Sequence, residues 1–183
     1  MNSVAFILTI AVTGYLLICV GIFSRKKLNY SQMRHTISEL GEAGGDHARS
    51  VAYLVFLPTG LLLFLIAYLA QPHGMPTVTL AGCIAVGYVI AAFSPCDVGS
   101  PLTGSGRQSI HNLGGTVEYL GGAVALLQLS KQIDPLFSVA GYFVLGASVA
   151  ISIPVLAGIR GLIQRVAEIC LFAGLALALW FAK

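Results

Sequence analysis

Long apolar runs separated by short polar stretches make up most of this chain. Six such runs lie at about residues 2–24, 49–70, 76–96, 112–130, 135–157 and 161–182. An α-helix needs about 20 apolar residues to cross the hydrocarbon core of a bilayer, and each run is close to that length. The pattern predicts an all-α polytopic membrane protein, a six-transmembrane-helix bundle that forms one transmembrane domain over residues 1–183.

The composition also indicates that the chain is surrounded by lipid. Of the 183 residues, 57% are hydrophobic and only 9% are charged. A soluble domain carries about 25% charged residues, so this chain cannot cover a surface that faces water. The first run has no Lys or Arg before it and no small-residue cleavage site after it, which favours a retained span over a signal peptide.

Basic residues gather on one side of the predicted bundle. Eight of the ten lie after runs one, three and five or at the start of run six: Arg25, Lys26, Lys27, Arg34, Arg49, Arg107, Arg160 and Arg165. Cytoplasmic ends carry the excess of Lys and Arg, so this side is predicted to be cytoplasmic and both termini extracytoplasmic. Because topology explains the positive charge, we expect no nucleic-acid partner.

Two long polar connections lie on that same side. They are "RKKLNYSQMRHTISELGEAGGDHARS" and "FSPCDVGSPLTGSGRQSIHNLGG". Long connections in compact proteins are functional or else disordered linkers. Their Gly, Ser, His and Asp residues favour function, and we expect the second one to form a wall of a polar cavity that opens to the cytoplasmic side.

Ionisable residues also occur inside two predicted spans. Glu118 lies in run four, on one helical face with small residues such as Gly114, and Arg165 and Glu168 lie in run six. Such groups normally face the bundle interior or a water-filled cavity, and small residues let neighbouring helices approach closely. We expect Arg165 to be shared by the two glutamates. The alternative is that the three residues only hold helices in register.

These residues suggest a candidate site at the cytoplasmic end. The predicted catalytic residues are His111, Asp97 and Glu118, with His111 or Glu118 as the acid/base group and Asp97 assisting it. Arg165 would bind an anionic headgroup or developing charge. The predicted substrate-binding residues are Arg165, Glu168, Ser38, His35 and Glu39.

Cofactor motifs are largely missing. No G-K-[ST] follows the glycines of "GSPLTGSGRQS", and no strand–turn–helix unit surrounds "GTVEYLGG". No cofactor is expected. The alternative is a divalent metal such as zinc held by His35, Asp97 and His111, because imidazole and carboxylate ligands suit an open catalytic site.

Three segments together resemble a known family. They are "RHTISELGEAG" after the first run, "FSPCDVG" at the end of the third, and the His at the start of the fourth. With these segments the chain resembles a prokaryotic multi-pass membrane family known as domain of unknown function 998. The resemblance implies a six-helix protein with polar residues gathered at one end, placed in a prokaryotic plasma (inner) membrane. It implies no established reaction.

Two functions fit the sequence. The first is a membrane-embedded hydrolase or transferase whose lipid-like substrate enters sideways from the bilayer. The alternative is a non-enzymatic small transporter, or a structural subunit or partner of a membrane complex. Membrane lipids are the expected partners, together with a second copy of the chain or another membrane protein.

Overall fold

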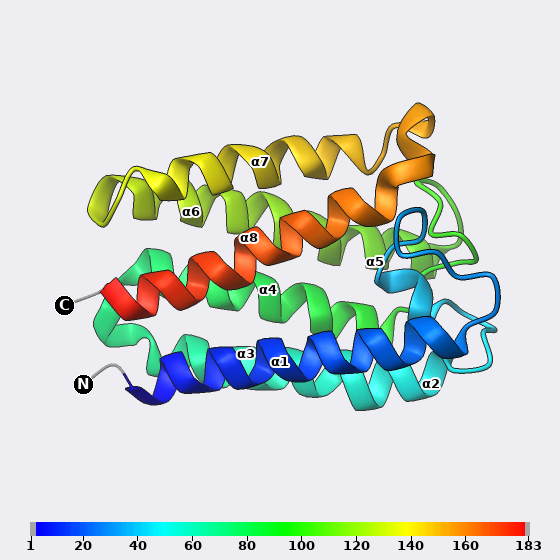
Figure 1. The fold of residues 1–183 in the computed structure, drawn as a ribbon, viewed down its shortest axis with the longest axis horizontal. Coiled ribbons are helices and arrows are strands. Elements are labelled where there is room, and N and C mark those ends of the chain that lie inside the picture. Colours follow the sequence, from blue (N-terminus) through cyan, green and yellow to red (C-terminus); the bar gives the residue numbers. More distant parts are fainter. Residues whose placement is uncertain (1–2, 182–183) are drawn as a thin grey trace.

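Helical rods packed side by side form the protein, as Figure 1 shows for the computed structural model, which describes residues 3–181. In chain order the rods are α1 (Ser3–Lys26), α2 to α3 (Ala48–Val51 and Leu57–Leu69, joined by the π-helical turn η2, Ala52–Phe56), α4 (Met75–Phe93), α5 to α6 (Gly106–Thr116 and Gly122–Gln132, joined by the π-helical turn η4, Val117–Gly121), α7 (Leu136–Ala150) and α8 (Arg160–Phe181). Short 3-10 turns lie at Ser38–Gly41 (η1), Gln71–His73 (η3) and Pro154–Ile159 (η5). The described residues contain no strand, which confirms the predicted all-α six-helix bundle.

Large apolar side chains cover much of the outer surface of the bundle. Leu17 and Ile18 on α1 are more than half exposed, while Leu63, Leu126 and Leu171 are fully buried in the core. Four helices are long and apolar enough to cross a membrane, namely Val4–Lys26, Ala48–Leu69, Met75–Phe93 and Pro154–Phe181. An outer surface of large apolar side chains requires lipid as its solvent, so the chain is an integral membrane protein.

The two ends of the bundle differ. Both chain termini lie at one end, and the long connections 27–47 (loop one) and 94–105 (loop two) lie at the other (Figure 1). We call the end that carries these two loops the loop end, and the opposite one the terminal end. An even number of antiparallel rods brings both termini to one side, so the polar loops gather opposite them.

Pro58 shapes the second rod. A proline in a helix has no N–H to donate to the carbonyl four residues earlier, which here is that of Leu54. Leu54 lies in the π-helical turn η2, and the Tyr15 hydroxyl of α1 donates a hydrogen bond to its carbonyl oxygen. A neighbouring side chain thus satisfies the freed backbone group, as lipid surroundings demand.

Glycines let α4 pack closely against the fourth rod. A Cβ added at Gly114 would lie 2.8 Å from Cβ of Ile90, and one at Gly87 would lie 2.7 Å from Cβ of Glu118. Neither position has room for a methyl group. The glycine face predicted for the fourth run therefore faces the bundle, and it brings Glu118 against α4.

One predicted span is divided. The run 135–157 holds α7 only as far as Ala150, and Pro154 then begins the 3-10 turn η5. Ile153 has an extended backbone (φ −87°, ψ 117°), as a residue before proline prefers, and this conformation ends the helix. The rest of the apolar run leads into α8 at the loop end.

Candidate functional site

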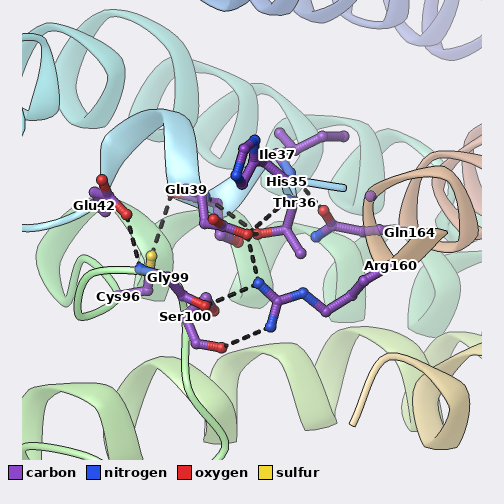
Figure 2. A network of polar contacts seen from close by, with 12 residues as sticks. His35, Thr36, Ile37, Glu39, Glu42, Cys96, Gly99, Ser100, Arg160 and Gln164 are labelled. Atoms are coloured by element: carbon purple, nitrogen blue, oxygen red, sulfur yellow. Dashed lines mark hydrogen bonds and ion pairs between the residues drawn. The ribbon is translucent and has the colours of Figure 1, made fainter. Parts of the chain in front are cut away.

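An ion pair joins both long loops to the start of α8, as Figure 2 shows. The Arg160 guanidinium donates to Oε1 of Glu39 in loop one at 2.7 Å. It also donates to the carbonyl oxygens of Gly99 and Ser100 in loop two, at 2.8 and 3.3 Å. Glu39 is only 3% exposed, and its Oε1 further accepts the backbone N–H of Thr36 at 2.9 Å. Arg160 thus links loop one and loop two to the first turn of α8.

A second set of contacts ties the two loops to each other. Lys27 pairs with Glu42 at 2.7 Å, and the N–H of Gly99 donates to the same carboxylate at 2.9 Å. The N–H of Ala43 donates to the carbonyl oxygen of Cys96 at 2.8 Å. Cys96 is fully buried beneath these contacts, and burial raises the pKa of its thiol to about 12. The thiol therefore stays protonated and inert in the closed loops.

Loop two folds around Asp97. Its carboxylate accepts the N–H of Ser105 at 2.7 Å, the hydroxyl of Ser105 at 2.8 Å and Arg107 at 2.6 Å. These bonds, first of all the backbone bond from Ser105, hold the pKa of Asp97 below its usual range. Ser105 in turn caps α5 by accepting the N–H of Gln108 at 3.2 Å, so the fourth rod begins at Gly106, earlier than the run predicts.

A polar cavity of about 470 Å³ lies beneath the loops, between the fourth rod, α7 and the start of α8. Its polar lining includes Thr36, Ser38, His111, Asn112, Glu118 and Gln164. This volume suits a small ligand or the headgroup of a larger one. We call it the polar cavity.

His111 is held in a defined orientation on the wall of the polar cavity. Its Nδ1 lies 2.9 Å from the carbonyl oxygen of Ser94, and a carbonyl can only accept. Nδ1 therefore carries the proton, and Nε2 is the basic nitrogen. The residue precedes the apolar part of the fourth run, and burial lowers the pKa of its imidazole, with the Ser94 carbonyl partly opposing that effect.

Two buried glutamates face each other deeper in the bundle. Glu118 on η4 and Glu168 on α8 are each 7% exposed and line a small cavity of about 20 Å³. The hydroxyls of Tyr119 and Tyr88 donate to Glu168, at 2.6 Å to Oε1 and 3.0 Å to Oε2. Glu118 Oε1 is buried and has no hydrogen-bond partner. The π-helical turn places Glu118 at this position, and such turns are frequent at functional sites.

The predicted pairing of Arg165 with these glutamates is wrong. Its Nη1 donates to the carbonyl oxygens of Gln32 (2.7 Å), His35 (2.9 Å) and Gly161 (2.9 Å), and its Nη2 donates to the Tyr30 hydroxyl at 2.6 Å. The reason is the close approach of loop one to α8, which presents a cluster of carbonyl oxygens at the first turn of that helix. Among the described residues, no carboxylate pairs with this guanidinium.

An apolar groove of about 920 Å³ runs along the outside of the bundle between α1 and α8. Phe6 and Trp180 contact each other at the terminal end, with ring centroids 5.2 Å apart, and Gln32 and Arg165 lie at the loop end. We call this groove the lipid groove. Glu168 also lines it, Glu118 lines the polar cavity, and both line the small cavity of about 20 Å³.

The predicted site residues fall into three groups. Ser38, His111 and Glu118 line the polar cavity, whereas Arg165 and Glu168 line the lipid groove. The remaining three, His35, Glu39 and Asp97, take part in hydrogen bonds that fold the loops. These contacts hold the loops together and leave those three residues outside the lining of the polar cavity.

The alternative zinc set is not brought together. His35 accepts the N–H of Ser31 through Nδ1 at 2.8 Å, and its ring packs on Tyr30. Asp97 is enclosed by its own loop, and His111 lies on the cavity wall. Within residues 3–181, no three His, Cys, Asp or Glu side chains lie close enough to hold a metal ion.

Sequence reasoning missed several residues of this region. Arg160 was counted only as a topological charge, yet it joins the loops. Gln108 is fully buried and accepts the N–H of Asp97 at 2.7 Å. Tyr88 and Tyr119 donate to Glu168 from runs that looked uniformly apolar. A tyrosine next to a glutamate in "VEYLGG" was the one available signal, because a buried hydroxyl seeks a partner.

Comparison with known proteins places the chain in a family. No curated protein and no solved structure matches it. Residues 4–181 match the family described as "Protein of unknown function (DUF998)", and this match covers nearly the whole chain. The predicted resemblance to this family is therefore confirmed, and the chain belongs to it.

Proposed function

We propose that this protein is a membrane-embedded hydrolase or transferase that acts on a lipid-like substrate, with His111 as the general base. The observation that carries the proposal is the orientation of His111. Its Nδ1 is bound to the Ser94 carbonyl, and its ring lies on a polar cavity of about 470 Å³. A neutral imidazole with a free Nε2 is the commonest general base in enzymes.

The polar cavity offers the groups that such a reaction needs. Glu118 lies seven residues after His111 on the same rod, about 10 Å along the helix at 1.5 Å per residue. A substrate bond placed between them would meet a base at one side and a carboxyl group at the other. His111 would take the proton of a water or hydroxyl as its oxygen attacks the acyl or phosphoryl centre. Glu118 would then give a proton to the leaving oxygen.

The lipid groove supports the substrate class. It is apolar along most of its length and faces the bilayer, so it suits an acyl chain. The Arg165 guanidinium lies at its loop end with its donors on neutral carbonyl and hydroxyl oxygens. Among the described residues no carboxylate forms an ion pair with it, and its positive charge favours an anionic headgroup at the membrane surface.

The experiment compares two histidine variants. The purified protein is placed in vesicles that contain ester, amide and phosphodiester lipids, zwitterionic and anionic, and the lipids are analysed by mass spectrometry. His111→Ala should lose the product by about 100-fold or more, the range for loss of a general base. His73→Ala is the matched control, because His73 lies in η3 at the terminal end, and it should keep full activity.

Two results would overturn the proposal. One is the absence of any product from these lipids with the unaltered protein. The other is equal turnover by the two variants. Activity should also persist below the ordinary histidine range of about pH 6.5, because the pKa of His111 is lowered and its basic form survives further into acid.

A specific observation favours a second candidate, a small transporter. The small cavity shares Glu118 and Gln164 with the polar cavity and Ile37 and Glu168 with the lipid groove, so a movement of these side chains would connect the two spaces. Vesicles that show no chemical product but pass a labelled lipid between leaflets would favour transport.

A further inference from the structure

The buried pair Glu118 and Glu168 has no cation to balance it. Within the described chain, the three ion pairs use Lys27–Glu42, Arg107–Asp97 and Arg160–Glu39. Arg165 lines the lipid groove beside Glu168 but directs its donors to loop one and Tyr30. An ionised carboxylate buried without a partner costs several kcal/mol, and two that face each other cost more.

The hydrogen bonds distinguish the two carboxyl groups. Glu168 accepts from Tyr88 on one oxygen and from Tyr119 on the other, the arrangement that stabilises an ionised carboxylate. Glu118 has no such donors, and its buried Oε1 is without a partner. Both glutamates line the same cavity of about 20 Å³, so the two carboxyl groups lie close to each other.

We infer that Glu118 and Glu168 form a proton-binding dyad, in which Glu118 carries a proton that the two carboxyl groups share. The ligand is a single positive charge of the smallest size, since the cavity between them holds about one water. The titratable groups that face the dyad are Tyr88 and Cys83 from α4 and Tyr119 from η4. None of these brings a positive charge.

The position of the dyad gives the proton a route. Glu118 lines the polar cavity together with His111, and Glu168 lines the lipid groove. A proton that enters the cavity at the loop end would reach Glu118 first and Glu168 second. Carboxyl groups at such depth in membrane proteins serve proton relays. The dyad therefore offers a proton-binding step between the two spaces, and it does not depend on catalysis by His111.

Dicyclohexylcarbodiimide tests the inference on the full chain in detergent. The acid proton passes to a nitrogen of this hydrophobic reagent, the carboxyl oxygen bonds to its central carbon, and an acyl shift leaves a stable N-acylurea. Peptide mass spectrometry then locates the adduct. We expect Glu118 to be labelled at neutral pH, and the labelling rate to fall about tenfold per pH unit once the pH exceeds the value at which the dyad loses its proton.

Glu39 is the internal control. It is as buried as Glu118, but Arg160 pairs with it at 2.7 Å, so it should stay unlabelled. Glu168→Gln removes the second negative charge, so labelling of Glu118 should be lost at a lower pH than in the unaltered chain. Equal labelling of Glu118 and Glu39, or an unchanged pH profile in Glu168→Gln, would overturn the dyad.

Two further outcomes are decisive. If a sodium salt protects Glu118 from labelling and a salt of a large organic cation does not, the dyad binds a metal cation and the inference of proton binding is overturned. If the protein is labelled at Glu118 but forms no lipid product, the proton-binding dyad is supported and the proposed enzymatic function is refuted. The two proposals can therefore fail separately. The comparison of Glu118 with Glu39 uses the unaltered chain, and it stands even if Glu168→Gln does not fold.

Discussion

Replacing Arg160 with alanine should open both long loops. In the folded protein its guanidinium contacts Glu39 of loop one and the carbonyl oxygens of Gly99 and Ser100 in loop two. Removing it leaves the Glu39 carboxylate buried with only the N–H and hydroxyl of Thr36 as donors. The expected result is a large rise in the rate of loop opening while the helices stay folded.

The structure sets the size of the effect. The Arg160 and Glu39 side chains are 19% and 4% exposed, so removing the half-buried arginine leaves a buried carboxylate without its cation. Breaking a buried pair by removing one partner costs about 3–5 kcal/mol. Every 1.4 kcal/mol is about a factor of ten, so even the lower figure predicts loop opening about 100-fold more often.

Cys96 provides the assay. Its thiol is fully buried between the loops, and its pKa of about 12 keeps it protonated, so it reacts only when the loops open. In a chain where Cys19, Cys83 and Cys170 are replaced with alanine, the rate of thiol labelling in detergent reports loop opening. Arg160→Ala should raise that rate about 100-fold.

Arg107→Ala is the matched control from the same end of the bundle. The Arg107 and Asp97 side chains are 43% and 22% exposed, and an exposed pair contributes about 0–1 kcal/mol. This variant should raise labelling of Cys96 by less than about fivefold. If Arg160→Ala labels no faster than Arg107→Ala, the Arg160–Glu39 pair does not hold the loops closed.

Three further predictions test the packing, the loop and the topology. Gly87→Ala should destabilise the bundle by about 1–3 kcal/mol, because a Cβ there meets the buried glutamate of η4. Gly82→Ala lies on the same helix with nothing within 4 Å, so it should not lower the thermal midpoint in detergent. The bonds to the Asp97 carboxylate stabilise loop two at pH values above the ordinary pKa range of Asp, and they are lost as the pH falls through its lowered pKa. Hydrogen exchange in residues 98–105, corrected for its intrinsic pH dependence, should therefore speed up in acid. Asp97→Asn should abolish that response. Single cysteines at Ser31 and Gln71 should differ towards an impermeant thiol reagent applied to intact cells, and labelling at Ser31 alone would reverse the predicted orientation.

Much of the architecture follows from the sequence alone. Apolar runs of about 20 residues can be satisfied only by helices in lipid, so the number of rods and their lipid-facing surface could be predicted from residue order. The same periodicity put Glu118 on one face with Gly114, and the structure buries that face against α4. The long polar loops could likewise be assigned to one end, because six antiparallel rods leave no other arrangement.

Only the tertiary structure decided the partners of the charged residues. Arg165 and Arg160 lie five residues apart on α8, and the sequence favoured Arg165 as the partner of a glutamate. Loop one instead presents its carbonyl oxygens to Arg165, while its Glu39 pairs with Arg160. Long side chains can reach several partners, and the choice depends on loop positions that no local pattern determines. The uncompensated Glu118–Glu168 pair is the consequence of that choice, so the feature from which we infer proton binding became visible only once the loops were in place.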